Sequence, residues 1–540
     1  MSQNSNNHIS KRSLWIITLC FIVIIAIVPL IQLGKEIYFG EHIAEADIFH
    51  GVPTNAKVRA YEKAIEDSSF IARYARLWFQ LPLTCLGNQG NSKVVIGRDG
   101  WLFYRFSLDY ITKPSSSFYR ESAPFDAIID FRDELRSQGV ELMLLPIPGK
   151  STIYPEYLSR RYKPNFGSAT NIHTKEFFQK LRDKGINVID PTDILWEQKR
   201  ASNDDLLYLQ QDTHWSPKGM KLVAGYLSDT ISKSDWLKGT PKKSYAIQTV
   251  DVTRFGDLYD MLNLPKSRSC YKPKTIKVDR VIDAETSKPC RADTGSPIVL
   301  LGDSFVNIFS VSDMGWGENA GLGEHLAFDL KTPIDIIALN DGGATGSREQ
   351  LARRPNALVG KKIVIWQFPT RDLTNPESDW KIIKIPKPKK IEKPKIEKPE
   401  PQKAKIEEEK PIETKKEEIK VEKPEIEEPK EKHLTVIGEV ILVSNVPDPN
   451  QVAYSECLTY IKYRVISVEN GKYDDKELIA VFWGMKESKL MPAAKFQIGE
   501  KHRLVLDPLD KYGDLLHIMQ ADDTDDYEHT PYWVLEMSSQ

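Results

Sequence analysis

Short apolar segments alternate with amphipathic segments from about Val94 to Phe368, and this alternation limits the possible folds most strongly. Parallel strands need long crossover connections, usually helices, so the pattern predicts a doubly wound, mostly parallel α/β sheet. The predicted strands are Val140 to Ile147, Ile186 to Ile189, Ile298 to Leu301, Ile334 to Leu339 and Lys362 to Phe368. The predicted helices include Phe125 to Ser137, Thr174 to Lys184 and Gly219 to Ile231.

Two later parts of the chain depart from this pattern. Lys238 to Thr294 is polar and rich in loop-forming residues, and we interpret it as an insertion that helps to shape a cleft. Residues 381–432 consist largely of Lys, Glu, Pro and Ile, with units such as Ile391-Glu392-Lys393-Pro394. Such a segment cannot bury a core, so it is predicted to be a disordered, solvated linker, with a docking surface as the alternative.

Residues 433–540 regain the composition of a folded domain. Short β-like runs are separated by turn signals such as Glu469-Asn470-Gly471, which predicts a small all-β domain, either a barrel or a sandwich. The predicted strands are Leu434 to Val443, Tyr460 to Val468, Glu477 to Trp483 and His502 to Leu506.

A nearly unbroken apolar run, Leu14 to Leu33, follows Lys11 and Arg12. About twenty apolar residues suffice to cross a bilayer, and a basic flank favours a cytoplasmic N-terminus. We therefore expect residues 1–13 to be a cytoplasmic tail and residues 14–33 to be a transmembrane signal anchor. A cleaved signal peptide is the alternative, which the lack of a small-x-small cleavage site disfavours.

Four cysteines lie outside this run: Cys85, Cys270, Cys290 and Cys457. A disulfide would persist in an exported domain, and Cys270 with Cys290 is the nearest pair, so we predict that bond. No Cys-x-x-Cys or His cluster indicates a metal site. The 74 basic and 76 acidic residues nearly balance, so net charge gives no argument for nucleic-acid binding.

Two motifs about ninety residues apart carry the chemistry: Asp212-Thr213-His214-Trp215 and Gly302-Asp303-Ser304-Phe305. A serine becomes a useful nucleophile when an imidazole takes its proton and a carboxylate orients that imidazole. The Gly-Asp-Ser turn follows a predicted strand, where backbone N–H groups can hold an oxyanion. Taken singly, the first motif could be an ordinary core histidine and the second an ordinary helix N-cap.

Six sequence blocks together resemble the alginate O-acetyltransferase AlgJ/AlgX family, which has an SGNH-hydrolase-like domain. They are Gly97 to Tyr104, Pro148 to Lys150, Asp212 to Trp215, Gly256 to Leu258, Gly302 to Phe305 and Ile365 to Arg371. In that family Asp-x-His precedes Gly-Asp-Ser, as it does here. The resemblance implies an SGNH-like acetyltransferase domain over 41–380, with its core at 92–372.

The resemblance also implies site residues and partners. Ser304 would be the nucleophile, His214 the base and Asp212 its orienting acid, and the N–H groups of Ser304 and Gly343 would form the oxyanion hole. No cofactor is implied. Family members lie at the bacterial inner membrane or in the periplasm and O-acetylate exopolysaccharides. They receive acetyl groups from a membrane-bound O-acyltransferase, so we expect that partner, a polysaccharide acceptor and a periplasmic catalytic domain.

Other residues in these blocks are candidates for substrate binding, each with a structural alternative. Lys150 could approach the cleft or lie on the surface, and Arg371 could bind an acidic sugar or form a structural salt bridge. Trp215 could line the acceptor site or support the histidine loop, and Trp366 is a further candidate. Gln367 stands where an acidic residue is expected in many relatives.

The expected function is therefore acetyl transfer through an acetyl-serine to hydroxyls of a cell-surface or exopolysaccharide of the alginate type. Water could replace the sugar as acceptor, which would make the protein a polysaccharide O-acetyl esterase. A non-catalytic scaffold in a polysaccharide export complex is the alternative from another class.

Overall fold

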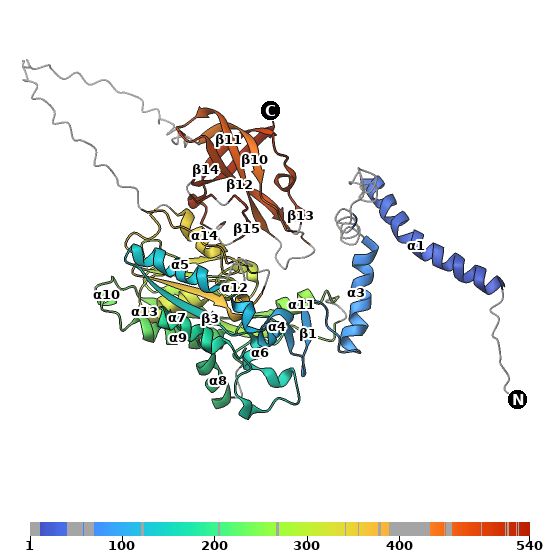
Figure 1. Ribbon diagram of the computed structural model, residues 1–540, viewed down its shortest axis with the longest axis horizontal. Coiled ribbons are helices and arrows are strands. Elements are labelled where there is room, and N and C mark those ends of the chain that lie inside the picture. Colours follow the sequence, from blue (N-terminus) through green and yellow to red (C-terminus); the bar gives the residue numbers. More distant parts are fainter. Residues whose placement is uncertain are drawn as a thin grey trace, which may run out of the picture.

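The computed structural model shows an α/β domain, a C-terminal β-barrel and helices near the N-terminus (Figure 1). It describes residues 11–39, 58, 70–119, 124–202, 206–265, 269–340, 342–354, 356–375, 378, 380–387, 433–447, 449, 456–487, 489–513, 515, 518–524, 526–527 and 529–539. Most of the predicted linker, at 388–432, and most of the predicted tail, at 1–10, lie outside these residues.

A five-stranded, fully parallel sheet forms the centre of the α/β domain. Its order is β4 (Asn187–Val188), β3 (Glu141–Ile147), β9 (Ile363–Pro369), β7 (Ile298–Gly302) and β8 (Asp335–Ala338). The predicted α/β class and all five predicted strands are confirmed. These strands are mostly apolar and almost wholly buried because both faces of the sheet are covered.

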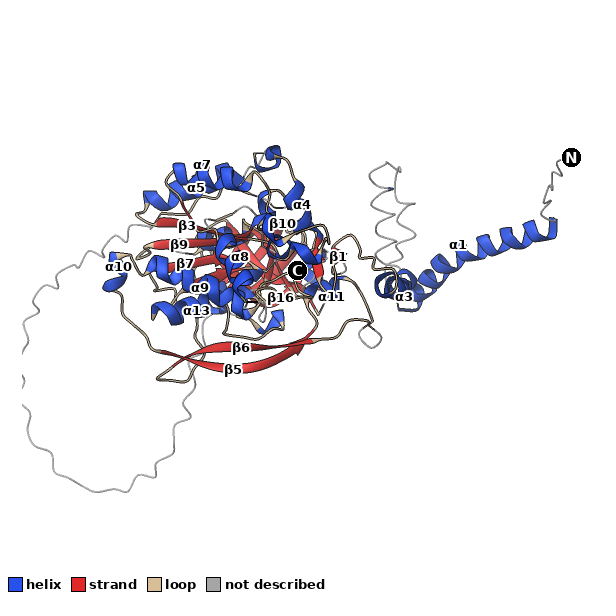
Figure 2. Ribbon diagram, turned by 90° about the horizontal axis from the view of Figure 1, so that it is seen from below, coloured by secondary structure: helices blue, strands red, loops and turns tan. Residues whose placement is uncertain are grey.

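Helices cover the sheet on its two sides (Figure 2). The helices on one side are α5 (Pro124–Ser137), α7 (Thr174–Asp183) and α14 (Gly346–Arg353), and those on the other are α9 (Pro217–Ile231) and α13 (Leu322–Leu330). Neighbouring strand residues join different cores: Val299 packs with the α5 side and Leu300 with the α9 side. The packed chain continues past the last strand as far as Ile385.

The predicted loop-rich insertion contains more regular structure than its composition indicated. Strands β5 (Tyr245–Arg254) and β6 (Lys274–Asp283) form a long antiparallel ribbon beneath α9 and α13 (Figure 2). Helix α11 (Asp257–Met261) lies between the two strands in sequence. Most side chains of β5 are exposed or half-buried, so polar residues there are compatible with a strand.

The C-terminal domain is a closed barrel. Its sheet has the order β13 (Lys489–Leu490), β12 (Glu477–Lys486), β16 (Pro531–Ser539), β14 (Lys501–Pro508), β10 (Leu434–Val443), β11 (Cys457–Asn470) and β15 (Met519–Ala521). An additional pairing of β12 with β11 closes the ring. The prediction of a small all-β domain is confirmed, and its barrel form is the one observed.

The predicted transmembrane helix requires a correction. The segment 14–33 does lie within a helix, α1 (Lys11–Phe39). Crossing a bilayer requires about twenty residues of sustained apolar character. No helix among the described residues is both long enough and apolar enough to do so, and the prediction of a transmembrane helix is therefore wrong.

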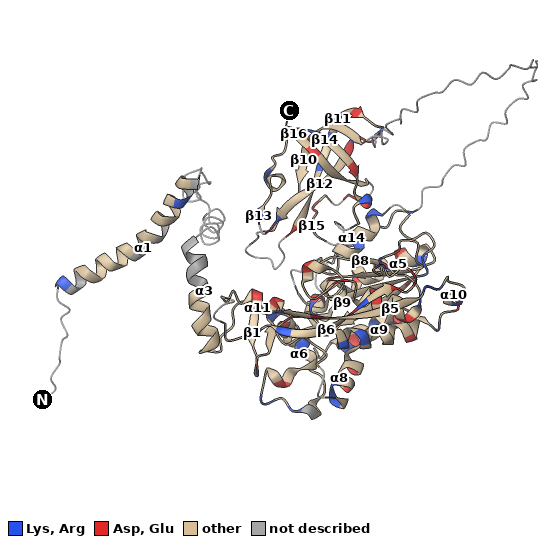
Figure 3. Cartoon of the chain, turned by 180° about the vertical axis from the view of Figure 1, so that it is seen from behind, with Lys and Arg blue, Asp and Glu red and all other residues tan. Residues whose placement is uncertain are grey.

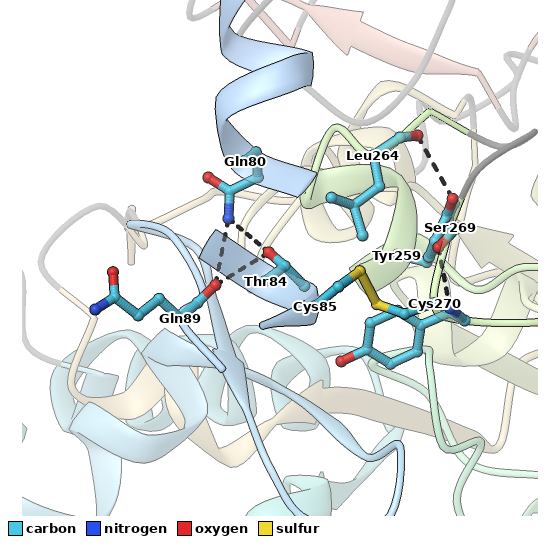
Figure 4. Close-up of a disulfide and its surroundings, with 9 residues drawn as sticks. Gln80, Thr84, Cys85, Gln89, Tyr259, Leu264, Ser269 and Cys270 are labelled. Atoms are coloured by element: carbon cyan, nitrogen blue, oxygen red, sulfur yellow. Dashed lines mark hydrogen bonds between the residues drawn. A yellow bond between two sulfur atoms is a disulfide. The ribbon is translucent and has the colours of Figure 1, made fainter. Parts of the chain in front are cut away.

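The disulfide prediction is also wrong. Cys270 bonds to Cys85, which ends helix α3 (Phe70–Cys85), and the Cα atoms of this pair are 5.8 Å apart (Figure 4). Cys290 is a free, buried thiol. The prediction relied on closeness in sequence, whereas a disulfide requires closeness in space, here between residues 185 positions apart.

Removing the Cys85–Cys270 bond should destabilise the protein, because the bond closes a long loop of the unfolded chain. We expect Cys85→Ala and the double variant Cys85→Ala/Cys270→Ala to lower the free energy of unfolding equally, by about 2–4 kcal/mol. Urea unfolding with and without reductant measures this. Peptide mapping should find the two cysteines linked and Cys290 alkylated only after denaturation, and a Cys270–Cys290 peptide would contradict the structure.

Candidate active site

Ser304 stands at the carboxyl end of a central strand. Strand β7 ends at Gly302, and the four-residue helix α12 (Ser304–Asn307) begins with the serine. Asp303 caps this helix by accepting a hydrogen bond from the backbone N–H of Phe305 at 2.9 Å. A Cβ on Gly302 would lie 2.3 Å from Val306 Cγ2 and 2.6 Å from Gln367 Oε1, so only glycine fits this close approach.

Gln367, on the neighbouring strand β9, fixes the same turn. Its Oε1 accepts a hydrogen bond from the backbone N–H of Asp303 at 3.0 Å, and its side chain is fully buried. The amide oxygen of Gln367 therefore accepts the Asp303 N–H at the position where an acidic residue was expected.

The two motifs meet at this turn. His214 Nε2 lies 2.8 Å from Ser304 Oγ, and His214 Nδ1 lies 2.7 Å from Asp212 Oδ1. His214 and Asp212 are both buried, whereas Ser304 is partly accessible. The arrangement has the geometry of a nucleophile, a general base and an orienting carboxylate.

The Asp212 carboxylate is held by donors from three parts of the chain. Oδ1 accepts a hydrogen bond from the His214 ring and a second one from the His214 backbone N–H at 3.1 Å. Oδ2 accepts the Asp257 backbone N–H at 3.0 Å and Trp316 Nε1 at 2.8 Å. These bonds leave the carboxylate in one orientation and therefore fix the imidazole as well.

Lys150 holds the backbone of the same loop. Its buried Nζ donates hydrogen bonds to the carbonyl oxygens of Leu209 at 2.9 Å, Gln210 at 3.0 Å and Asp212 at 2.6 Å. The ammonium also lies 5.4 Å from the ring centroid of Phe103. Lys150 is therefore a positioning residue for the loop that carries Asp212 and His214.

Asp257 places a second carboxylate beside the base. Its Oδ1 accepts the backbone N–H of Thr213 at 2.7 Å, its Oδ2 accepts the Thr213 hydroxyl, and Oδ2 lies 3.6 Å from His214 Nδ1. The distance to the ring is that of a charge contact without a hydrogen bond. Asp257 thus acts on His214 through its charge and through Thr213.

The electrostatics follow from these contacts. Burial raises the pKa of Asp212, but hydrogen bonds from His214, the Asp257 backbone and Trp316 outweigh burial and hold the pKa well below its usual range. Burial lowers the pKa of His214, but the hydrogen bond and charge of Asp212, together with the charge of Asp257, raise it above its ordinary value. Burial, with the charge of Asp212, raises the pKa of Asp257 to about 6.

The turn after β8 lies beside the nucleophile. Gly343 has a φ of +53°, in the left-handed region that glycine adopts readily, and it lines the same cleft as Ser304. Asn307 ties this turn to α12, because its Nδ2 donates to Ala338 O at 2.9 Å and to Asn340 Oδ1 at 3.0 Å. The N–H of Ser304 belongs to the first turn of a helix, where no intrahelical acceptor is available.

A cleft of about 390 Å³ opens in front of Ser304. Of the four residues predicted to bind substrate, Arg371 lines it, with its guanidinium 5.3 Å from the Tyr104 ring centroid. Trp215 and Trp366 are fully buried and pack against Phe305 and Trp380, respectively, so the structure contradicts a substrate contact for both. Lys150, described above, is also too buried to reach substrate.

Asp212, His214 and Asp257 also form a group whose ligand atoms all lie within 4.8 Å of one another, as in a metal site. The hydrogen bonds described above already occupy these atoms, and His214 Nε2 points to Ser304 Oγ. The serine site therefore accounts for the closeness of these three side chains without a metal ion.

Sequence reasoning missed Asp257 and Trp316 as parts of this site. Gly256-Asp257-Leu258 was one of the matched blocks, but no role was assigned to it. A Cβ on Gly256 would lie 2.2 Å from Gln211 O, so this glycine lets α11 approach the Asp212 loop. Trp316 lies in no matched block, and nothing in its local sequence indicates a contact with Asp212.

Comparison with protein families matches residues 94–370, just over half of the chain, to the SGNH hydrolase-like domain of acetyltransferase AlgX. The probable alginate O-acetylase AlgJ of Pseudomonas aeruginosa is 27% identical over 318 residues, covering 56% of this chain and 78% of the relative. The protein of the same name from Azotobacter vinelandii is 27% identical over 349 residues, covering 59% and 81%. A solved O-acetyltransferase domain of Pseudomonas putida AlgJ has a TM-score of 0.41 and 22% identity, covering 52% of this chain and 92% of that domain.

Replacing Asp257 should change the pH dependence of the site. The Asp257 charge stabilises the His214 imidazolium, so Asp257→Asn lowers the pKa of His214 and keeps the imidazole neutral at lower pH. The acid limb of kcat/KM for hydrolysis of a small acetyl ester should therefore move to lower pH. The plateau should stay within about tenfold of the parent, whereas Asp212→Asn should lower kcat by on the order of a thousandfold. An acid limb that moves to higher pH would contradict this role.

Replacing Lys150 should weaken the fold and the site together. Lys150→Met removes the donor of two buried carbonyl oxygens, those of Leu209 and Asp212, and one of the two donors to Gln210 O, which should cost about 2 kcal/mol or more of unfolding free energy. Ester hydrolysis should fall as well, because the Asp212 loop loses its support. Lys180→Met, in an exposed pair with Glu176, is the control and should change the stability by less than about 0.5 kcal/mol. Equal stability losses in the two variants would overturn this role for Lys150.

Proposed function

We propose a function from the premise that this chain belongs to the family of SGNH hydrolase-like domains of acetyltransferase AlgX. The protein is an O-acetyltransferase that moves an acetyl group through acetyl-Ser304 to a hydroxyl of an exopolysaccharide. The observation that carries this proposal is the hydrogen-bonded line from Ser304 Oγ through His214 to Asp212 at the edge of an open cleft.

In the first half-reaction, Ser304 Oγ attacks the carbonyl carbon of an acetyl ester or thioester while His214 Nε2 accepts the hydroxyl proton. The carbonyl oxygen becomes an oxyanion that the N–H groups of Ser304 and Gly343 stabilise. The tetrahedral intermediate collapses, the bond to the leaving group breaks, and His214 returns the proton to the leaving oxygen or sulfur. Acetyl-Ser304 remains.

In the second half-reaction, a sugar hydroxyl enters the cleft and attacks acetyl-Ser304. His214 Nε2 takes the hydroxyl proton, the same oxyanion site stabilises the second intermediate, and the proton returns to Ser304 Oγ as the acetylated sugar leaves. Asp212 stays ionised throughout, because its hydrogen bonds hold its pKa low, and it stabilises the imidazolium in each step.

The names of the relatives support transfer to a sugar over hydrolysis. The related proteins are named probable alginate O-acetylases, which suggests an alginate-like polymer as the acceptor. The same residues would act as an esterase if water attacked acetyl-Ser304. We assign the donor step to a partner, a membrane-bound O-acyltransferase that supplies the acetyl group.

The disulfide supports an extracytoplasmic location. Disulfides persist in oxidising compartments such as the bacterial periplasm and are rare in the cytosol. The bond between Cys85 and Cys270 fixes α3 next to α11, close to the site itself. We therefore place the catalytic domain in the periplasm.

Ser304→Ala tests this function. The parent protein should form acetylated sugar from an acetyl-donor ester and deacetylated alginate oligomers, and Ser304→Ala should lower the rate by at least about a thousandfold. Ser232→Ala, which removes an exposed hydroxyl at the end of α9, is the control and should retain the parent rate. Mass spectrometry of the sugar and measurement of free acetate separate the outcomes. If the parent forms free acetate alone, the protein is an esterase. If Ser304→Ala still forms acetylated sugar and free acetate at the parent rates, serine catalysis is excluded.

A further inference from the structure

The C-terminal barrel lies against the part of the α/β domain that holds the nucleophile, and two views show β15 next to α14 (Figures 1 and 3). Helix α14 begins beside the Gly343 turn and ends at Arg353. There Arg353 forms an ion pair with Asp522 of the barrel, and both side chains are only 4% exposed. One helix thus links the proposed oxyanion turn to the barrel.

Further buried polar contacts fix the barrel on this helix. Gln350 Nε2 donates to Gln520 Oε1, which also accepts the hydroxyl of Tyr460 at 2.5 Å. The Tyr527 hydroxyl donates to Glu349 Oε1 at 2.7 Å. A shifted barrel would leave these buried groups unpaired, so the contacts favour one docked position.

The docked barrel supplies one wall of the active-site cleft. Met519, Gln520 and Asp522 line the same cleft of about 390 Å³ as Ser304 and Gly343. A cleft of this size is within the usual range for small-molecule sites. Any acceptor that reaches Ser304 through this cleft therefore also passes β15.

Arg353, which lines this cleft, has donors that no acceptor among the described residues satisfies. Arg353 is buried, and its Nε and Nη1 atoms have no hydrogen-bond partner within the described part of the chain. Buried polar groups of this kind are rare in folded proteins unless a ligand or water completes them. Arg353 lines the cleft, so oxygen atoms of a bound molecule could accept these bonds.

The charges of the cleft indicate what kind of molecule fits. The basic residues Arg353, Arg371 and Lys381 face the acidic residues Asp303, Glu349, Asp372 and Asp522. Three of these make ion pairs within the site: Arg353 with Asp522, Lys381 with Glu349 at 3.6 Å, and Arg371 with Asp372 at 4.0 Å. A cleft without net positive charge selects its ligand by hydrogen bonds to oxygen atoms, as hydroxyl-rich sugars provide.

We propose that β15 of the barrel and the cleft-lining residues of α14 together form the acceptor subsite, in which Arg353 and Gln520 bind the hydroxyl-rich glycan segment that is acetylated. The inference rests on the proposed function and deepens it. The barrel is thus part of the transferase site, and acceptor choice depends on the interface between the two domains.

Two variants of the full chain test this subsite. Met519→Trp fills the cleft from the barrel side, and Arg353→Lys keeps a charge for Asp522 but removes the Nε and Nη1 donors. Each should lower kcat/KM for transfer to deacetylated alginate oligomers or cello-oligosaccharides at least tenfold more than it lowers hydrolysis of a small acetyl ester. Met537→Trp, at an exposed position on β16 outside the cleft, is the matched control and should retain the parent ratio of transfer to hydrolysis.

The outcomes separate this inference from the proposed function. If the parent hydrolyses the ester and acetylates neither sugar, transfer itself fails. If the parent transfers and both cleft variants keep the parent ratio of transfer to hydrolysis, the acceptor subsite is elsewhere and this inference is wrong. Circular dichroism identifies a misfolded variant, and then the other variant decides. Binding of the same oligomers to Ser304→Ala, weakened by Arg353→Lys, gives a second readout that does not depend on turnover.

Discussion

One buried carboxylate holds the site together. Asp212 receives hydrogen bonds from the ring and backbone of His214, from the α11 backbone and from Trp316, whose position is 104 residues away in sequence. These donors come from three separate parts of the chain, and a shift of any of them would leave a buried charge less well paired. The orientation of the imidazole toward Ser304 Oγ depends on this convergence.

The parallel sheet provides the other half of the site. Strands β7, β8 and β9 are neighbours, and Ser304 and the Gly343 turn follow two of them and line the same cleft. Gln367, on the third, accepts a hydrogen bond from the backbone N–H of Asp303, next to Ser304. Ligands of open α/β sheets bind at this edge because the loops there are free to vary while the strands stay rigid. The β5–β6 ribbon and Cys270 of the disulfide flank α11 in sequence, and α11 supplies the Asp257 backbone N–H that binds Asp212.

The barrel adds a further layer to this arrangement. Its contacts with α14 are polar and buried, and they come from strands that are distant in sequence, such as Tyr460 and Gln520. Such an interface favours one docked geometry more than it favours strong association. A domain that docks through polar contacts of this kind keeps a defined position on the α/β domain.

The sequence alone determined the parts of this protein that depend on local patterns. Short, mostly apolar runs identified the five parallel strands, β-like runs between turn signals identified the main barrel strands, and Asp212 with His214 could be paired because they lie two residues apart. The Gly-Asp-Ser motif after a strand indicated Ser304, and the family resemblance implied Gly343. Only the tertiary structure decided the partner of Cys270, the positioning role of Lys150, the burial of Trp215 and Trp366, and the participation of Asp257 and Trp316. The apolar N-terminal run illustrates the same limit, because length and composition there predicted a membrane span that no described helix provides. The disulfide and the contacts of Lys150, Asp257 and Trp316 join segments from about 45 to 185 positions apart. No local periodicity encodes which distant side chains meet once the sheet has folded.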